Sequence, residues 1–229
     1  KDPEVEPEPL PRFGNGVLVI NEGNFTAGNA SLGFVAANRD VFQNIYDNAN
    51  DLPLGDVAQS AIEWQGDYFI VVNNSGRIVR VNDEMTQIGA VTGLTSPRFL
   101  LPLGGNKAYV TDLYADAISI LDLEAGSITG TIPVGSWTED LVRSGDEALV
   151  AEMGANRVLV LDVNSDAVID SIPVGREPNS LLLDDNGHLW VLCGGADNSG
   201  ARLVQVDPTN RSILNDFPFP EASDRPSNL

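Results

Sequence analysis

The sequence predicts an all-β fold, and more specifically a β-propeller of four-stranded antiparallel blades. Three observations lead to this prediction. Short β-rich segments alternate with turn residues, one pattern of segments recurs about every 40 residues, and helical periodicity is nearly absent. A β-sandwich is the alternative, but a sandwich has no reason to repeat itself at a fixed offset.

The repeat is clearest in the middle of the chain. Lys107–Asp112 alternates and is rich in β-forming residues, a short loop leads to a second strand at Ile118–Asp122, and a turn leads to Ser127–Gly135. Adding 40 to these numbers aligns three further segments: Val150–Glu152 with Val110–Asp112, Val160–Asp162 with Ile120–Asp122, and Ile172–Gly175 with Ile132–Gly135.

The same strands can be followed toward both ends. Equivalent central pairs are Gly16–Ile20 with Leu32–Ala36, Tyr68–Val72 with Arg77–Asn82, and Leu189–Cys193 with Arg202–Asp207. A first strand precedes the pairs at Arg98–Leu101, Asp140–Val142 and Ser180–Leu183. The chain thus enters at the second strand of a blade, holds about five blades' worth of sequence, and ends at Pro226–Leu229, which matches the opening of a first strand. A chain that ends there either closes a small ring with a very short strand or has lost its C-terminal part. We expect the second, so that residues 14–229 are propeller blades that are incomplete at the C-terminal end.

Residues 1–13 differ from the rest in composition. They are rich in Pro and Glu and cannot bury a core, which predicts a solvated linker. Such a tether often follows a removed targeting segment or a lipid anchor, so we expect membrane attachment only through an N-terminal anchor outside this sequence.

The formal net charge is −20, from 33 acidic and 13 basic residues. A surface this negative repels phosphates and excludes nucleic acid as a partner. Two explanations stay open. One is a soluble, self-repelling surface, and the other is adaptation to high salt in a halophilic source, which the excess of Asp over Glu and of Arg over Lys favours.

The repeat separates scaffold from site. Asp122, Asp162, Asp207 and Asn82 recur at one position and are expected to close turns, and Gly135 and Gly175 are expected to be turn glycines. Propeller geometry brings the loops between blades and the loops between second and third strands to one edge, the upper rim. Residues that differ there between blades are Arg98, Glu139 and Asn179 in one slot, with Arg176 beside them and Tyr114 and Trp137 as aromatic surface. The alternative is that Trp137 fills a gap between blades and the polar groups line a wet channel.

Catalytic motifs are scarce. His188 is the only histidine, so a Ser–His–Asp triad would have to use it, and its place in a strand-leading turn argues against that mechanism. Cys193 is the only cysteine, so a His/Cys metal cluster cannot form. Asp-rich turns such as Asp184–Asn186 could hold calcium weakly. We therefore expect a protein that is not an enzyme, and no catalytic residues or bound metal.

Several segments together resemble the YncE-like propellers of Bacteroidetes surface lipoproteins, the DUF5074 family. They are Val17–Asn24, Leu54–Ser60, Val71–Gly76, Ser96–Arg98, Tyr109–Tyr114, Gly135–Glu139 and Leu189–Cys193. The resemblance implies a seven-bladed ring, of which this chain is part. It also implies that Asn73, Asn74 and Asp112 belong to the functional surface, together with Arg98, Tyr114, Trp137 and Glu139. Some members of this group, the BtuG-type proteins, capture vitamin B12 and pass it to a TonB-dependent transporter.

The first hypothesis is therefore a non-enzymatic ligand-binding lipoprotein, exported to the cell surface, outer membrane or periplasm. A corrinoid is the named candidate ligand, and an outer-membrane transporter is the expected partner. The second hypothesis is a scaffold for another protein at the outer membrane. The third is a calcium-dependent propeller hydrolase or lactonase, which requires inward carboxylates converging on one ion.

Overall fold

The computed structural model describes Phe13 and residues 15–196, 200–221 and 224–229. Within them the chain forms one three-stranded and four four-stranded sheets, all antiparallel where their pairing is defined. The predicted all-β fold of four-stranded blades is therefore confirmed. The chain divides into two compact units, and each is described by itself; the boundary falls between residues 90 and 91, near the end of the last strand of the second blade.

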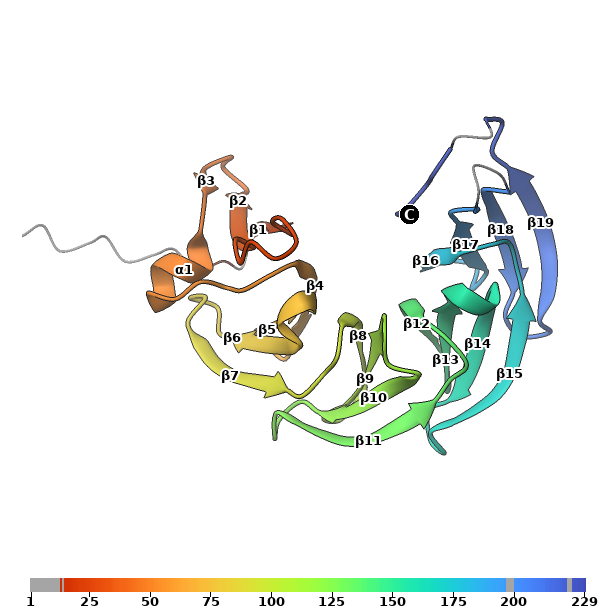
Figure 1. Cartoon of the computed structure of the whole chain (residues 1–229), viewed down its shortest axis with the longest axis horizontal. Helices are drawn as coiled ribbons and strands as arrows, with labels where there is room; N and C mark the ends of the chain where they lie inside the picture. The colour runs from red at the N-terminus through yellow and green to blue at the C-terminus, as the bar shows by residue number, and fades with distance from the viewer. Residues whose placement is uncertain (1–12, 14, 197–199, 222–223) are drawn as a thin grey trace, which may run out of the picture. The chain divides into compact units, whose positions relative to one another are not determined.

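The first unit holds two blades (Figure 1). Blade 1 consists of β1 (Gly16–Asn21), β2 (Ser31–Ala36) and β3 (Val41–Phe42). Blade 2 consists of β4 (Ala58–Trp64), β5 (Asp67–Val72), β6 (Arg77–Val81) and β7 (Gln87–Thr92), with a 3-10 turn, η1, at Asn73–Ser75.

A short helix, α1 (Ile45–Asn50), lies between the two blades in sequence and was not predicted. Six residues are too few to show helical periodicity, and only Ile45 and Tyr46 are apolar and buried. Asn50 fixes the end of α1, because its side-chain amide donates to the Met85 carbonyl and accepts from the Gln87 N–H. Among the described residues, no helix has the length and apolar character that a membrane-spanning helix requires.

Phe13 belongs to the packed part of the chain. Its ring is buried, lies 5.0 Å from the Phe34 ring, and its backbone N–H donates to the Asp83 carbonyl. The rest of the predicted linker, residues 1–12, lies outside the described residues.

The second unit holds three blades, whose inner strands β8, β12 and β16 lie side by side (Figure 1). Each inner strand begins a blade and each fourth strand ends one at the outer edge. Blade 3 is β8 (Pro97–Gly104), β9 (Lys107–Asp112), β10 (Ala117–Asp122) and β11 (Ser127–Pro133). Blade 4 is β12 (Thr138–Ser144), β13 (Glu147–Glu152), β14 (Arg157–Asp162) and β15 (Ala167–Pro173), with a 3-10 turn, η2, at Met153–Ala155. Blade 5 is β16 (Pro178–Leu183), β17 (Leu189–Cys193), β18 (Arg202–Asp207) and β19 (Ser212–Pro218).

Blade 4 is buried on both faces, and the period of two along its strands explains how. Ala148 and Val150 of β13 pack in the core shared with blade 3, whereas Leu149 and Ala151 pack in the core shared with blade 5. Because both faces are covered, the middle of β13, Ala148–Ala151, is continuously apolar and lacks the simple polar–apolar alternation of a half-exposed strand.

The recurring Asp and Asn residues close turns, as predicted. Asp122 accepts from the Ala125 N–H, Asp162 from the Asn164 and Ser165 N–H groups, and Asp207 from the Thr209 N–H. Gly135 and Gly175 lie in the bends that follow β11 and β15, but neither has a positive φ, so glycine is not needed there for a left-handed backbone. At Gly175 the reason for glycine is space: a Cβ there would lie 2.9 Å from the Cys193 Cβ.

Ion pairs connect neighbouring blades at the edge opposite the upper rim, which we call the lower edge. Lys107 of blade 3 pairs with Asp166 in the β14–β15 turn of blade 4, with Nζ 2.5 Å from Oδ1. Glu147 of blade 4 pairs with Arg211 in the β18–β19 turn of blade 5 at 2.5 Å. Lys107 and Glu147 occupy the same repeat position, 40 residues apart, so the signs of the charges are exchanged from one junction to the next. Tyr109 adds to the first junction, because its buried hydroxyl donates to Asp166.

Candidate ligand-binding rim

In the second unit, the upper rim comprises the loops and strand ends at residues 95–98, 113–116, 134–139, 153–156, 174–179 and 194–196. One backbone hydrogen bond repeats along it, from the loop after each second strand to the loop that enters the same blade. The Leu113 N–H donates to the Ser96 carbonyl, the Met153 N–H to that of Trp137, and the Gly194 N–H to that of Glu177. The two sets of loops therefore meet at one edge.

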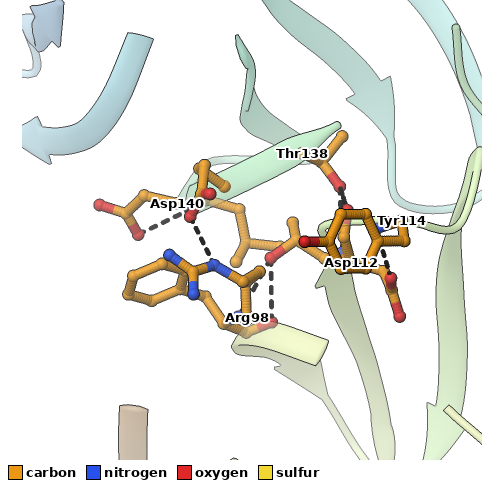
Figure 2. Close-up of polar contacts among 9 residues, drawn as sticks. Arg98, Asp112, Tyr114, Thr138 and Asp140 are labelled. Atoms are coloured by element: carbon orange, nitrogen blue, oxygen red, sulfur yellow. Dashed lines mark hydrogen bonds and ion pairs between the residues drawn. The ribbon is translucent and has the colours of Figure 1, made fainter. Parts of the chain in front are cut away.

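The last residue of each second strand holds the entering loop. Asp112 is 2% exposed and accepts from the Thr95 and Ser96 N–H groups with one oxygen. Its other oxygen accepts from the Tyr114 and Ala115 N–H groups. Its backbone N–H and carbonyl both bond the Thr138 hydroxyl of the next blade (Figure 2). Asp112 thus shapes the rim from within, and its contact with a ligand stays a prediction.

Glu152 and Cys193 occupy the same position in blades 4 and 5. Glu152 is buried, accepts from the Gly135 N–H at 2.8 Å and pairs with Arg157. Cys193 is buried as well, and burial raises the pKa of its thiol to about 12, so the thiolate is not formed near neutral pH.

Arg98 and Glu139 connect the starts of the inner strands β8 and β12. The Arg98 Nε donates to the Glu139 Oε2 at 2.8 Å, and the side chains are 21% and 6% exposed. Burial raises the pKa of Glu139, and the Arg98 guanidinium opposes that rise. Two residues predicted for the site are therefore brought together, as partners of each other.

Asp140 performs a related function at the next junction (Figure 2). Its side chain accepts from the Leu181 N–H of β16 at 2.8 Å, and burial raises the pKa of its carboxyl. The contact recurs one blade later, where the Ser180 hydroxyl accepts from the Leu229 N–H at 3.1 Å. Asn179, beside Ser180, donates from its amide to the Pro226 carbonyl, and its Oδ1 is buried with no hydrogen-bond partner among the described residues.

A pocket of about 280 Å³ opens on the upper rim where blades 4 and 5 meet. It brings together Trp137 and Arg176, both predicted for the site from different loops. Trp137 is 48% exposed, which favours a role at the surface over filling a gap between blades. The lining residues are Trp137, Met153, Gly154, Asn156, Arg176, Glu177 and Ala196.

The other five lining residues were not among the predicted site residues: Met153, Gly154, Asn156, Glu177 and Ala196. Met153 follows the second strand of blade 4 directly, and its position in a rim loop was the available signal. Asn156 has φ of 56°, a conformation that Asn tolerates better than most residues, and it ends η2.

The remaining predicted residues lie apart from this pocket's lining. Tyr114 is 67% exposed in the β9–β10 loop. Asn73 and Asn74 belong to the first unit, where Asn73 is buried and the Asn74 amide donates to Asp56 at 2.6 Å. Within the described residues, no group of three or more His, Cys, Asp or Glu side chains is placed to hold a metal ion. The calcium-dependent alternative thus has no placed site in that part of the chain.

A family model described as Domain of unknown function (DUF5074) matches residues 15–227, which include every blade. No curated protein sequence matches the chain.

Solved structures similar to the chain include WD40 β-propeller domains. Streptogramin B lyase superposes with a TM-score of 0.70 at 14% identity, over 95% of this chain and 78% of that one. A Bacteroides caccae protein of unknown function gives 0.61 at 14%, over 88% and 72%. Kuenenia stuttgartiensis hydrazine synthase gives 0.63 at 19%, over 67% of this chain, which spans only 46% of the synthase chain. At these identities the likeness shows the propeller fold alone, in enzymes and non-enzymes alike.

Proposed function

The chain belongs to the DUF5074 family, and we propose that it is a non-enzymatic binding protein whose ligand lies on the upper rim. One observation carries the proposal. The same backbone hydrogen bond is accepted by Val57, Ser96, Trp137 and Glu177 in successive blades, so the scaffold does not require a particular side chain there. Yet blade 4 places a half-exposed indole in this slot, at the mouth of a pocket. A large exposed aromatic that the fold does not need supports a binding role.

The resemblance to surface-capture propellers makes a corrinoid the first ligand to test. A pocket of about 280 Å³ lies at the lower end of the range for small-molecule sites, so it would hold one group of such a ligand while the rest lay across the rim. The same proposal places the protein at the cell surface or in the periplasm, handing its ligand to an outer-membrane transporter.

Titration with cobalamin, followed by tryptophan fluorescence and by the visible spectrum of the corrinoid, tests the proposal. Binding should quench fluorescence, and Trp137→Phe should remove most of the quenching and weaken binding. Trp190→Phe is the matched control, because Trp190 lies outside the pocket lining and stacks on Phe217. If cobalamin causes no change at high micromolar concentration, the corrinoid version is refuted.

A second candidate is a docking surface for another protein, favoured by the exposure of Tyr114 and Trp137. Tyr, Trp and Arg are the residues that most often dominate protein interfaces. Capture of an outer-membrane transporter from membrane extracts, lost on Trp137→Ala and on Arg98→Ala, would support it. Capture that survives both substitutions would place the contact elsewhere.

A further inference from the structure

We propose that the pocket between blades 4 and 5 selects ligands that carry an anionic group on a flat apolar body. This inference rests on the proposed function, since it specifies what the same pocket recognises. It follows from three features of the lining: an apolar wall, donors with defined orientation, and local positive charge.

The apolar wall comes from blade 4. Trp137 supplies a half-exposed indole and Met153 a polarisable thioether, and both suit the face of a planar ring. Gly154 adds no side chain, and a Cβ there would lie 2.9 Å from the Ser136 Oγ. Glycine therefore lets the loop pack closely while the mouth of the pocket stays open.

Asn156 presents donors. Its Oδ1 accepts from the Glu177 N–H at 3.1 Å, which fixes the orientation of the amide. The NH₂ end, which can only donate, makes no hydrogen bond to other residues in the described part of the chain. A pocket-lining amide held in this way recognises an acceptor such as a carboxylate oxygen.

The chain has a formal net charge of −20, but the charges around the pocket favour binding of an anion. Arg176 lines the pocket, and its guanidinium carries five N–H donors, so one partner does not exhaust them. Glu177, the acidic lining residue, faces Arg225 at 3.8 Å, which offsets its charge. Arg157 and Arg202 begin the neighbouring strands β14 and β18, where they pair with Glu152 and Asp216. The basic side chain in the lining itself is that of Arg176.

A matched pair of probes tests the inference on the full chain: 2-naphthoate and 2-naphthylmethanol, which share a ring system and differ in charge. We expect calorimetry or ligand-detected NMR to give about tenfold tighter binding of the naphthoate, as for one charge-assisted hydrogen bond at a partly exposed site. The preference should shrink in 0.5 M salt, because the charges are screened.

Variants separate this inference from the proposed function. Arg176→Gln should reduce the preference to less than threefold, whereas Arg39→Gln, which removes an exposed arginine in the first unit, should leave it unchanged. Trp137→Ala should weaken both probes. If both probes bind equally and both depend on Trp137, the rim site stands and the anion preference is overturned. If neither probe binds at millimolar concentration, or if Trp137→Ala has no effect on binding, both the anion preference and the assignment of this pocket as the ligand site are refuted.

Discussion

Asp112 provides a sharp test of the division between scaffold and ligand site, because its two oxygens are fully used by the fold. Four backbone N–H groups donate to them at 2.8–3.2 Å, from Thr95, Ser96, Tyr114 and Ala115. Asp112 is 2% exposed, so these bonds are largely shielded from water. If Asp112 is scaffold, its replacement should lower the free energy of unfolding before it affects any ligand.

Asp112→Ala removes all four acceptor contacts, including the one for the N–H of the buried residue Ser96. A hydrogen bond to a charged group contributes about 1.5–3 kcal/mol, and the more exposed donors can turn to water, so we expect a loss of about 2–4 kcal/mol. Asp112→Asn should cost nearly as much, because its NH₂ group would face two donors in place of an acceptor.

Urea unfolding followed by circular dichroism measures the effect. With an m-value of about 3 kcal/mol/M, the midpoint should fall by roughly 1 M. Asp116→Asn is the matched control, since Asp116 lies exposed in the same loop region and should change the unfolding free energy by less than about 0.5 kcal/mol. An Asp112→Asn protein as stable as Asp116→Asn would refute the scaffold role.

Three further predictions concern other polar groups. At the lower edge, Lys107→Met should lower the free energy of unfolding in urea by less than about 1 kcal/mol. Asp166→Asn should lower it by more, because this change also weakens the hydrogen bond from the Tyr109 hydroxyl. Equal losses for the two variants would contradict this prediction. Because burial raises the pKa of Glu139, the folded state binds the proton of this carboxyl more tightly than the unfolded state does, and the resulting stability is present below the ordinary pKa and lost as pH rises through the raised value. In a pH series of unfolding curves, the wild type should therefore lose stability relative to Glu139→Gln from about pH 4.5 upward. Curves that run parallel for the two proteins would contradict this prediction. Cys193, with its pKa raised to about 12, should react with Ellman's reagent only in urea, and rapid labelling of the native chain would contradict its burial.

The fold could be predicted from the sequence because each blade repeats the same local pattern. Strands such as Lys107–Asp112 and Glu147–Glu152 share both spacing and apolar content, and Asp122 and its equivalents mark the same turn. The helix α1 could not be found this way, since its stability comes from two buried side chains and the bonds of Asn50 to residues about 35 positions away.

The site was only partly predictable. Position in a rim loop singled out Trp137 and Arg176, and the pocket contains both. The same reasoning could not distinguish them from Glu139, whose exposure and partner depend on the approach of Arg98 from another blade. Asn156 was missed because its value lies in the orientation of an amide, which is set by one backbone N–H and leaves no trace in residue type.

The exchanged charges at the lower edge also record the order of the blades. Each pair contributes little to stability, because all four side chains are roughly one-quarter to one-third exposed. A chain in which blade 5 took the place of blade 4 would, however, set Arg211 against Lys107, and like charges at that distance repel. The ion pairs therefore disfavour packing of a blade against the wrong neighbour. An array of similar repeats needs such discrimination if its blades are to pack in one order.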